Sequence, residues 1–127
     1  MTRLRLKLQV YCGDEIAMGP GKADLLEAID REGSISAAGR ALGMSYRRAW
    51  LLVDAMNRCF HQPLVEATPG GGKSAGARVT AAGFRALETY RALSTHAESA
   101  VQGPDFLRLQ EAIRDEPEMP ERGMPAE

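Results

Sequence analysis

The chain has 127 residues, of which 44% are hydrophobic, 26% charged and 6% aromatic. These proportions are typical of one soluble globular domain, and a chain of this length buries enough surface to fold without disulfides or metal. Its two cysteines, Cys12 and Cys59, are interpreted as reduced intracellular thiols rather than a disulfide. No secretory leader or run of about 20 apolar residues is recognisable, so we expect a cytoplasmic protein without cofactor or metal.

Charge is distributed unevenly along the chain, although the net charge at pH 7 is −1. Residues 34–79 carry six basic and two acidic side chains, whereas residues 98–127 carry three basic and eight acidic ones. Binding to a charged polymer depends on the local field more than on net charge. The middle of the chain is therefore the candidate for contacting phosphate groups.

A strand and a helix are expected before residue 34. Residues 3–12 alternate polar and apolar side chains, which predicts a half-buried strand. In residues 18–31, Pro20 lies near a first turn and apolar side chains follow at helical spacing. Gly33 is placed to end this helix in a left-handed conformation.

Two more helices, separated by a tight glycine turn, are expected in the middle. Ser36 is the expected N-cap of a short helix of small residues that ends at Leu42, and Ser45 is the expected N-cap of the next helix. From Tyr46 to Phe60, apolar side chains recur at intervals of three and four and predict one buried stripe.

A hairpin and a long helix complete the predicted domain, residues 1–102. Short apolar runs at 63–68 and 77–80 flank a glycine-rich segment, which predicts a two-stranded wing. Residues 81–101 predict a helix whose apolar face is broader than one small core needs, which suggests a dimer surface. The candidate dimer contacts are Leu4, Leu6, Ala86, Tyr90, Leu93 and Ala97.

Residues 103–127 are expected to form an acidic, proline-containing and largely disordered tail. Phe106, Leu109 and Ile113 are spaced for a brief amphipathic helix within it. The last dozen residues are expected to be disordered.

The order of these elements predicts a mainly α fold with small β, a winged helix-turn-helix whose third helix enters the major groove of DNA. Arg47 and Arg48 fall in the first turn of that helix, and arginine can donate two parallel hydrogen bonds to guanine. Backbone N–H groups after Ser36 are expected to hold a phosphate. The full set of candidate DNA contacts is Ser36, Arg40, Ser45, Tyr46, Arg47, Arg48 and Arg58, with Lys73, Ser74 and Arg78 on the wing.

Specific motifs strengthen this interpretation. The segments Gly-Ser-Ile-Ser-Ala-Ala-Gly (33–39), Met-Ser-Tyr-Arg-Arg-Ala-Trp (44–50), Asp-Ala-Met-Asn (54–57) and Leu-Val-Glu (64–66) closely resemble the DNA-binding domain of the ModE family of molybdenum-responsive regulators. The resemblance covers approximately residues 4–100. It implies a homodimer that binds palindromic operators and regulates transcription.

Family members also carry C-terminal molybdate-binding domains, and the resemblance is incomplete in this respect. About 25 residues follow the long helix, too few to form a sensing domain. The resemblance therefore leaves three alternatives: a stand-alone DNA-binding member, a partner of a separate sensor chain, or a member that answers another signal.

Other interpretations of the same residues were weighed. The arginines could form a solvated helix face, and the fold could serve as a protein-interaction module that partners a sensor chain or a full-length regulator. Trp50 is expected to pack as a wedge against the wing or the first helix in preference to contacting a base. Residues 67–74 fit a loose phosphate-loop pattern, but Ala-Gly-Ala after Ser74 is a poor helix start, so we expect no nucleotide hydrolase. Cys59 and His61, the nearest catalytic pair, are interpreted as structural.

Overall fold

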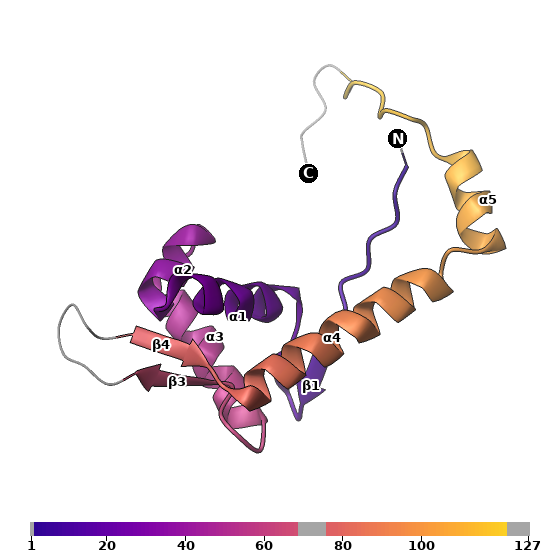
Figure 1. The fold of residues 1–127 in the computed structure, drawn as a ribbon. Coiled ribbons are helices and arrows are strands. Elements are labelled where there is room, and N and C mark those ends of the chain that lie inside the picture. The colour runs from indigo at the N-terminus through magenta and orange to yellow at the C-terminus, as the bar shows by residue number, and fades with distance from the viewer. Residues whose placement is uncertain (1, 69–75, 122–127) are drawn as a thin grey trace.

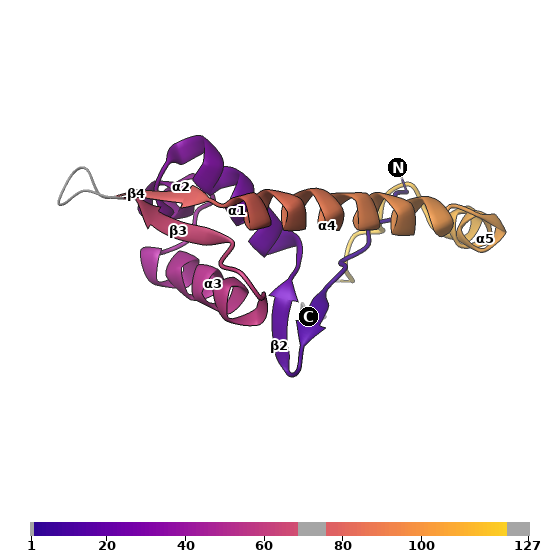
Figure 2. The same ribbon diagram turned by 60° about the horizontal axis from the view of Figure 1, so that its bottom comes forward.

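A computed structural model describes residues 2–68 and 76–121 (Figure 1). The first three helices pack together with two antiparallel hairpins, and a long helix extends from them to a short final helix (Figure 2). In chain order the elements are β1 (Val10–Cys12), β2 (Glu15–Met18), α1 (Pro20–Glu32), α2 (Ile35–Ala41), α3 (Tyr46–Cys59), β3 (Val65–Thr68), β4 (Gly76–Val79), α4 (Ala81–Ala100) and α5 (Pro104–Ala112). The predicted winged helix-turn-helix is confirmed.

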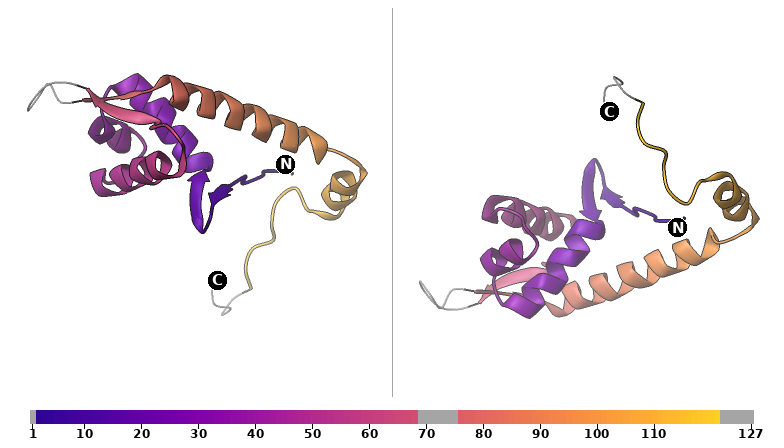
Figure 3. Two further views of the ribbon diagram at one scale, coloured as in Figure 1. Left: turned by 90° about the horizontal axis from the view of Figure 1, so that it is seen from below. Right: turned by 90° about the horizontal axis from the view of Figure 1, so that it is seen from above.

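The strand expected over residues 3–12 is wrong for most of its length. Only β1 is a strand, and it pairs antiparallel with β2 across a two-residue turn in which Gly13 has φ of 59°. Residues 2–9 belong to no strand and run toward the far end of α4 (Figure 3). Their alternation reflects partial burial of one face, since Leu8 packs against the core. A period of two indicates a covered face but does not identify what covers it.

Helix α1 confirms the prediction for residues 18–31 with slightly different bounds. Proline lies in its first turn, and Gly33 ends it with φ of 82° and a hydrogen bond from its N–H to the carbonyl of Ile29. Leu25, Leu26 and Ile29 are fully buried and form the centre of the core.

The N-cap of α2 is Ser34, so the prediction that Ser36 caps this helix is wrong. Ser34 is extended, and its side chain accepts a hydrogen bond of 3.0 Å from the N–H of Ala37. Because α1 ends at Gly33, the next residue is already extended and takes the capping position. Ser36 lies in the first turn of α2, where its hydroxyl accepts a 2.8 Å hydrogen bond from Arg40.

Helix α3 begins as predicted, with Ser45 as its N-cap. The Ser45 hydroxyl accepts a hydrogen bond of 3.1 Å from the N–H of Arg48. Helices α2 and α3 pack closely at Gly39, where an added Cβ would lie 3.2 Å from the Cβ of Ala49. This close approach fixes the orientation of α3 relative to α2 within the helix-turn-helix.

Asn57 joins α3 to the wing, β3 and β4. Its side-chain carbonyl accepts hydrogen bonds from the N–H groups of Leu64 at 2.8 Å and Val65 at 3.2 Å, and its amide donates to the carbonyl of Val65 at 2.9 Å. The strands are antiparallel, with Val65 opposite Val79. The start of the wing is therefore held to α3 by one side chain.

Helix α4 confirms the long helix expected over residues 81–101. It starts against the wing, where an added Cβ on Gly83 would lie 2.3 Å from the carbonyl oxygen of Leu64. Arg91 then pairs with Asp24 at 2.9 Å and with Glu27, which fixes α4 to α1. The second half of α4 leaves the body (Figure 2).

The candidate dimer contacts divide into two groups. Tyr90 is only 5% exposed and its hydroxyl donates a hydrogen bond of 2.7 Å to the carbonyl of Leu8, so this side chain is engaged within the chain. Ala86 likewise packs against the core. By contrast, Leu6 and Leu93 are exposed, while Leu4 and Ala97 are half-buried.

The short amphipathic helix expected near Phe106 is present as α5. The last six residues of the segment expected to be disordered lie outside the described residues, as do Lys73 and Ser74. None of the helices in the described part of the chain combines the length and hydropathy needed to cross a membrane. Gly76 begins a strand, so the phosphate-loop pattern is not followed by the helix that a nucleotide hydrolase requires.

Candidate nucleic-acid interface

The first turn of α3 presents positive charge to solvent. Tyr46, Arg47 and Arg48 are all exposed, and neither arginine forms an ion pair or side-chain hydrogen bond with the described residues. The N-terminal end of a helix also carries a partial positive charge from its unpaired N–H groups. This turn is therefore suited to acceptor atoms on phosphates and base edges.

Arg58, at the other end of α3, is bound by two carboxylates. It donates to Asp54 at 2.8 Å and to both oxygens of Glu15, at 2.5 and 2.7 Å. These hydrogen bonds, the one to Glu15 first, raise the pKa of Arg58, and the same contact lowers the pKa of Glu15. The charge pattern predicts Arg58 as a DNA contact, and in the structure this side chain joins α3 to the β1–β2 hairpin.

Arg78 has a similar environment on the wing. Its guanidinium donates to Glu66 on the opposing strand at 2.6 and 3.0 Å. This exposed cross-strand pair reduces the net charge of the wing near its base. The remaining two wing candidates, Lys73 and Ser74, are outside the described residues.

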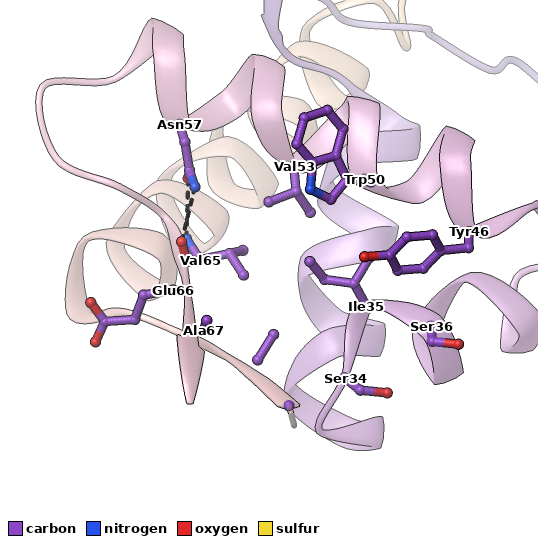
Figure 4. Close-up of a pocket in the computed structure, with 12 residues that line it drawn as sticks. Ser34, Ile35, Ser36, Tyr46, Trp50, Val53, Asn57, Val65, Glu66 and Ala67 are labelled. Carbon is purple, nitrogen blue, oxygen red and sulfur yellow. Dashed lines mark hydrogen bonds between the residues drawn. The ribbon is translucent and has the colours of Figure 1, made fainter. Parts of the chain in front are cut away.

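An open groove of about 520 Å³ separates α3 from the wing (Figure 4). Tyr46 and Trp50, one turn apart on α3, line one side, with β3 residues on the other. Ser34, Ile35 and Ser36 border the groove from the start of α2. The predicted contacts Ser36 and Tyr46 therefore line one groove, at the end of α3 whose first turn also carries Arg47 and Arg48.

Trp50 is a functional candidate that sequence reasoning gave a packing role. Its side chain is 47% exposed and lines the open groove between α3 and the wing, and Tyr46 is 57% exposed. Helical spacing contains a signal for this position, because residues four apart share a face. Tyr46, Trp50, Val53 and Asn57 follow this spacing and all line the groove.

The predicted site residues are thus separated by the fold. Ser36, Arg40, Ser45, Tyr46, Arg47 and Arg48 belong to α2 and the start of α3, or to the turn between them. Arg58 is ten residues beyond Arg48, about 15 Å along the helix axis. Within residues 2–68 and 76–121, no group of three or more His, Cys, Asp and Glu side chains is arranged to hold a metal ion.

Comparisons with known proteins identify proteins that are similar to this chain in sequence and in fold. Residues 22–84 match the family described as bacterial regulatory helix-turn-helix protein, lysR family. The chain is 52% identical over 66 residues to the molybdenum-pterin-binding protein MopA of Rhodobacter capsulatus, covering 52% of this chain and 25% of MopA. It is 35% identical over 91 residues to the DNA-binding transcriptional dual regulator ModE of Escherichia coli (strain K12), covering 72% of this chain and 33% of that regulator.

A solved structure with this fold is the CbnR_DBD-DNA complex, which matches with a TM-score of 0.51 at 22% identity. The match covers 74% of this chain and 97% of that one, and it concerns the fold. The chain spans between a quarter and a third of the length of the two curated relatives above. The sequence matches and the winged fold agree, and the chain therefore has the DNA-binding domain of the ModE family of transcriptional regulators.

Proposed function

We propose that the protein binds an inverted-repeat DNA operator as a homodimer and regulates transcription of genes linked to molybdenum. One observation carries this proposal: Arg47 and Arg48 are exposed and free of ion pairs among the described residues, on the first turn of a capped helix. Elsewhere on α3 and the described wing, arginines are bound to carboxylates. Unpaired guanidinium groups bind DNA without first breaking an ion pair.

In the proposed complex, α3 enters the major groove with its N-terminal end toward the base edges. Arg47 or Arg48 donates two hydrogen bonds to a guanine, and the apolar edges of Tyr46 and Trp50 contact thymine methyl groups. These four side chains are the proposed source of sequence specificity.

Phosphate contacts come from the surrounding elements. Ser36, Arg40 and Ser45 lie beside the groove or at the start of α3 and bind one strand of the backbone. Lys73, Ser74 and Arg78 of the wing bind the backbone on the other side, and Arg78 exchanges Glu66 for a phosphate. Arg58 holds the hairpin and stays at the periphery.

The dimer is formed by the second half of α4 together with the N-terminal segment. Leu6, Leu93 and Val101 are large apolar side chains that the chain leaves exposed there, and α5 adds Leu107 and Leu109. An exposed apolar surface of this kind is typical of an interface. Twofold symmetry places two copies of α3 about 34 to 36 Å apart, one helical turn of DNA.

The link to molybdenum rests on the names of the relatives, which are a molybdenum-pterin-binding protein and ModE regulators. The protein acts in the cytoplasm and is not an enzyme.

The test is selection of bound duplexes from a random DNA pool, followed by binding measurements on the enriched sequence. We expect an inverted repeat with half-sites one turn apart, and a complex of two chains per duplex by light scattering. With six or more phosphate contacts, affinity should fall about a thousandfold between 50 and 200 mM salt. Recovery of no common sequence, with salt-insensitive weak binding, would instead support the protein-interaction module.

A further inference from the structure

The two cysteines are far apart in the sequence, but the β1–β2 hairpin, which carries Cys12, packs against α3, which ends at Cys59 (Figure 2). Cys12 lies directly opposite Glu15 across the hairpin turn, and directly opposed residues share one face of a strand pair. Glu15 binds Arg58, the residue before Cys59. The backbone pairing and the ion pair therefore direct Cys12 toward Cys59.

The two thiols lie close enough for Cys12 to raise the pKa of Cys59. Both cysteines are free. Cys12 is exposed and borders a groove with Leu51, Leu52 and Ala55 of α3. Cys59 is half-buried. One thiol is thus open to a dissolved oxidant, and its neighbour is sheltered from it.

The environment of Cys59 supports different roles for the two thiols. Burial raises the pKa of Cys59, and the adjacent Cys12 adds to this increase. A thiol with a raised pKa is a poor nucleophile toward an oxidant in solution. Cys59 is suited to react with an oxidised neighbour that is already held against it.

We propose that Cys12 and Cys59 form a reversible intramolecular disulfide when the protein meets hydrogen peroxide. The Cys12 sulfur attacks one peroxide oxygen, the O–O bond breaks, and Cys12 becomes a sulfenic acid with release of water. The Cys59 sulfur then attacks the Cys12 sulfur, the S–O bond breaks, and the departing hydroxide takes the thiol proton to become water. Two thiols and one peroxide thus give one disulfide and two waters.

The disulfide would close a loop that contains β2, α1, α2 and most of α3. Closing a long loop restricts the unfolded chain, so the oxidised protein should unfold at a higher temperature. The first turn of α3 lies about 17 Å from Cys59 along the helix axis. The disulfide therefore does not depend on whether the proposed DNA function is correct.

The experiment treats the full reduced chain with hydrogen peroxide and follows intact mass, peptide mass after digestion, and Tm. We expect the mass to fall by two hydrogen atoms, a linked peptide pair containing Cys12 and Cys59, and a raised Tm. Dithiothreitol should reverse all three changes. Cys12→Ser and Cys59→Ser are matched controls, and neither should lose two hydrogens or gain in Tm on oxidation.

Three outcomes would overturn the proposal. Both thiols could remain titratable after oxidation, or Cys12 could accumulate as sulfinic acid without a linked peptide. A disulfide found only in covalent dimers, on a non-reducing gel, would also contradict it. Because Cys12 is exposed at a hairpin, Cys12→Ser should fold, and its Tm in the reduced state verifies this.

Discussion

The two ends of α3 carry similar side chains in opposite situations. At the N-terminal end, Arg47 and Arg48 face solvent without a carboxylate partner among the described residues. At the C-terminal end, Arg58 is held by Asp54 and Glu15, and Asn57 is held by the wing. In the proposed function, one helix thus uses its first turn to bind DNA and its last turns to hold the fold together. Charge alone does not distinguish an arginine available for binding from a structural one. The presence or absence of a carboxylate partner does.

The largest expected effect separates binding from folding at the first turn. Replacing Arg47 and Arg48 together by alanine should weaken operator binding by about 3 kcal/mol or more, since the arginine that reads a base contributes up to about 3 kcal/mol and the charge of its neighbour is lost as well. Fluorescence anisotropy with the selected duplex measures this loss. Tm should be unchanged, and Arg108→Ala, which removes an exposed ion pair on α5, is the matched control. Unchanged affinity in the double variant would place the reader elsewhere.

The next effect tests the structural end of the helix. Asn57→Ala removes three hydrogen bonds between α3 and the start of the wing, and should lower the free energy of unfolding by about 2 to 3 kcal/mol. Chemical denaturation measures it. Asn57→Asp keeps the acceptor for Leu64 and Val65 and loses only the donor, so its effect should be smaller. Equal losses for the two variants would mean that the acceptor contributes little.

A smaller effect concerns the groove. Trp50→Ala should weaken binding to the selected operator by about 1 kcal/mol through loss of an apolar contact with a thymine methyl group. Because Trp50 is half-exposed, Tm should change little. A duplex with uracil in place of thymine lacks this methyl group, so binding to it distinguishes a lost base contact from a loss of protein stability. If Trp50 instead packs for stability, Tm would fall and both duplexes would be affected alike.

The smallest effect lies at the Arg58 ion pair, which is exposed and screened by water. The lowered pKa of Glu15 means that its carboxylate stabilises the fold at neutral pH. This contribution is present above the unfolded pKa of Glu15 and is lost as pH falls through the lower folded value. Glu15→Gln should therefore lower Tm slightly at pH 7, and the difference from the wild type should vanish at acid pH, once the carboxylate of the folded protein is protonated. Operator affinity should stay the same, and its loss would assign Arg58 to the interface.

Local signals in the sequence predicted much of this fold. Gly33 ends α1 and Ser45 caps α3 because these features depend on a few neighbouring residues. The cap of α2 was predicted two residues late, since Ser34 and Ser36, on either side of Ile35, are both suitable capping residues. Strand β2 was missed because its four residues directly precede a helix and provide no alternation long enough to recognise.

The sequence does not predict the ion pairs of the site, because these contacts span long distances in the chain. The partner of Arg58 on the hairpin is 43 residues away, and the partner of Arg78 is on the opposing strand. A charge pattern indicates an excess of arginines but not which of them are paired. The exposure of Trp50 is hard to predict for a related reason, since whether a face of α3 is covered depends on where the wing lies.

The tight approach of Gly83 to Leu64 has a geometric consequence for any paired form of this protein. This approach holds the N-terminal end of α4 against the base of the wing, and the helix extends about 30 Å from that point. A tilt of α4 by about 5° about its N-terminal end moves its C-terminal end by about 2.6 Å over that length. If two copies of the protein pair through the C-terminal ends of α4, the distance between their α3 helices depends on the packing of Gly83. This glycine lies at the start of α4, away from the proposed DNA contacts.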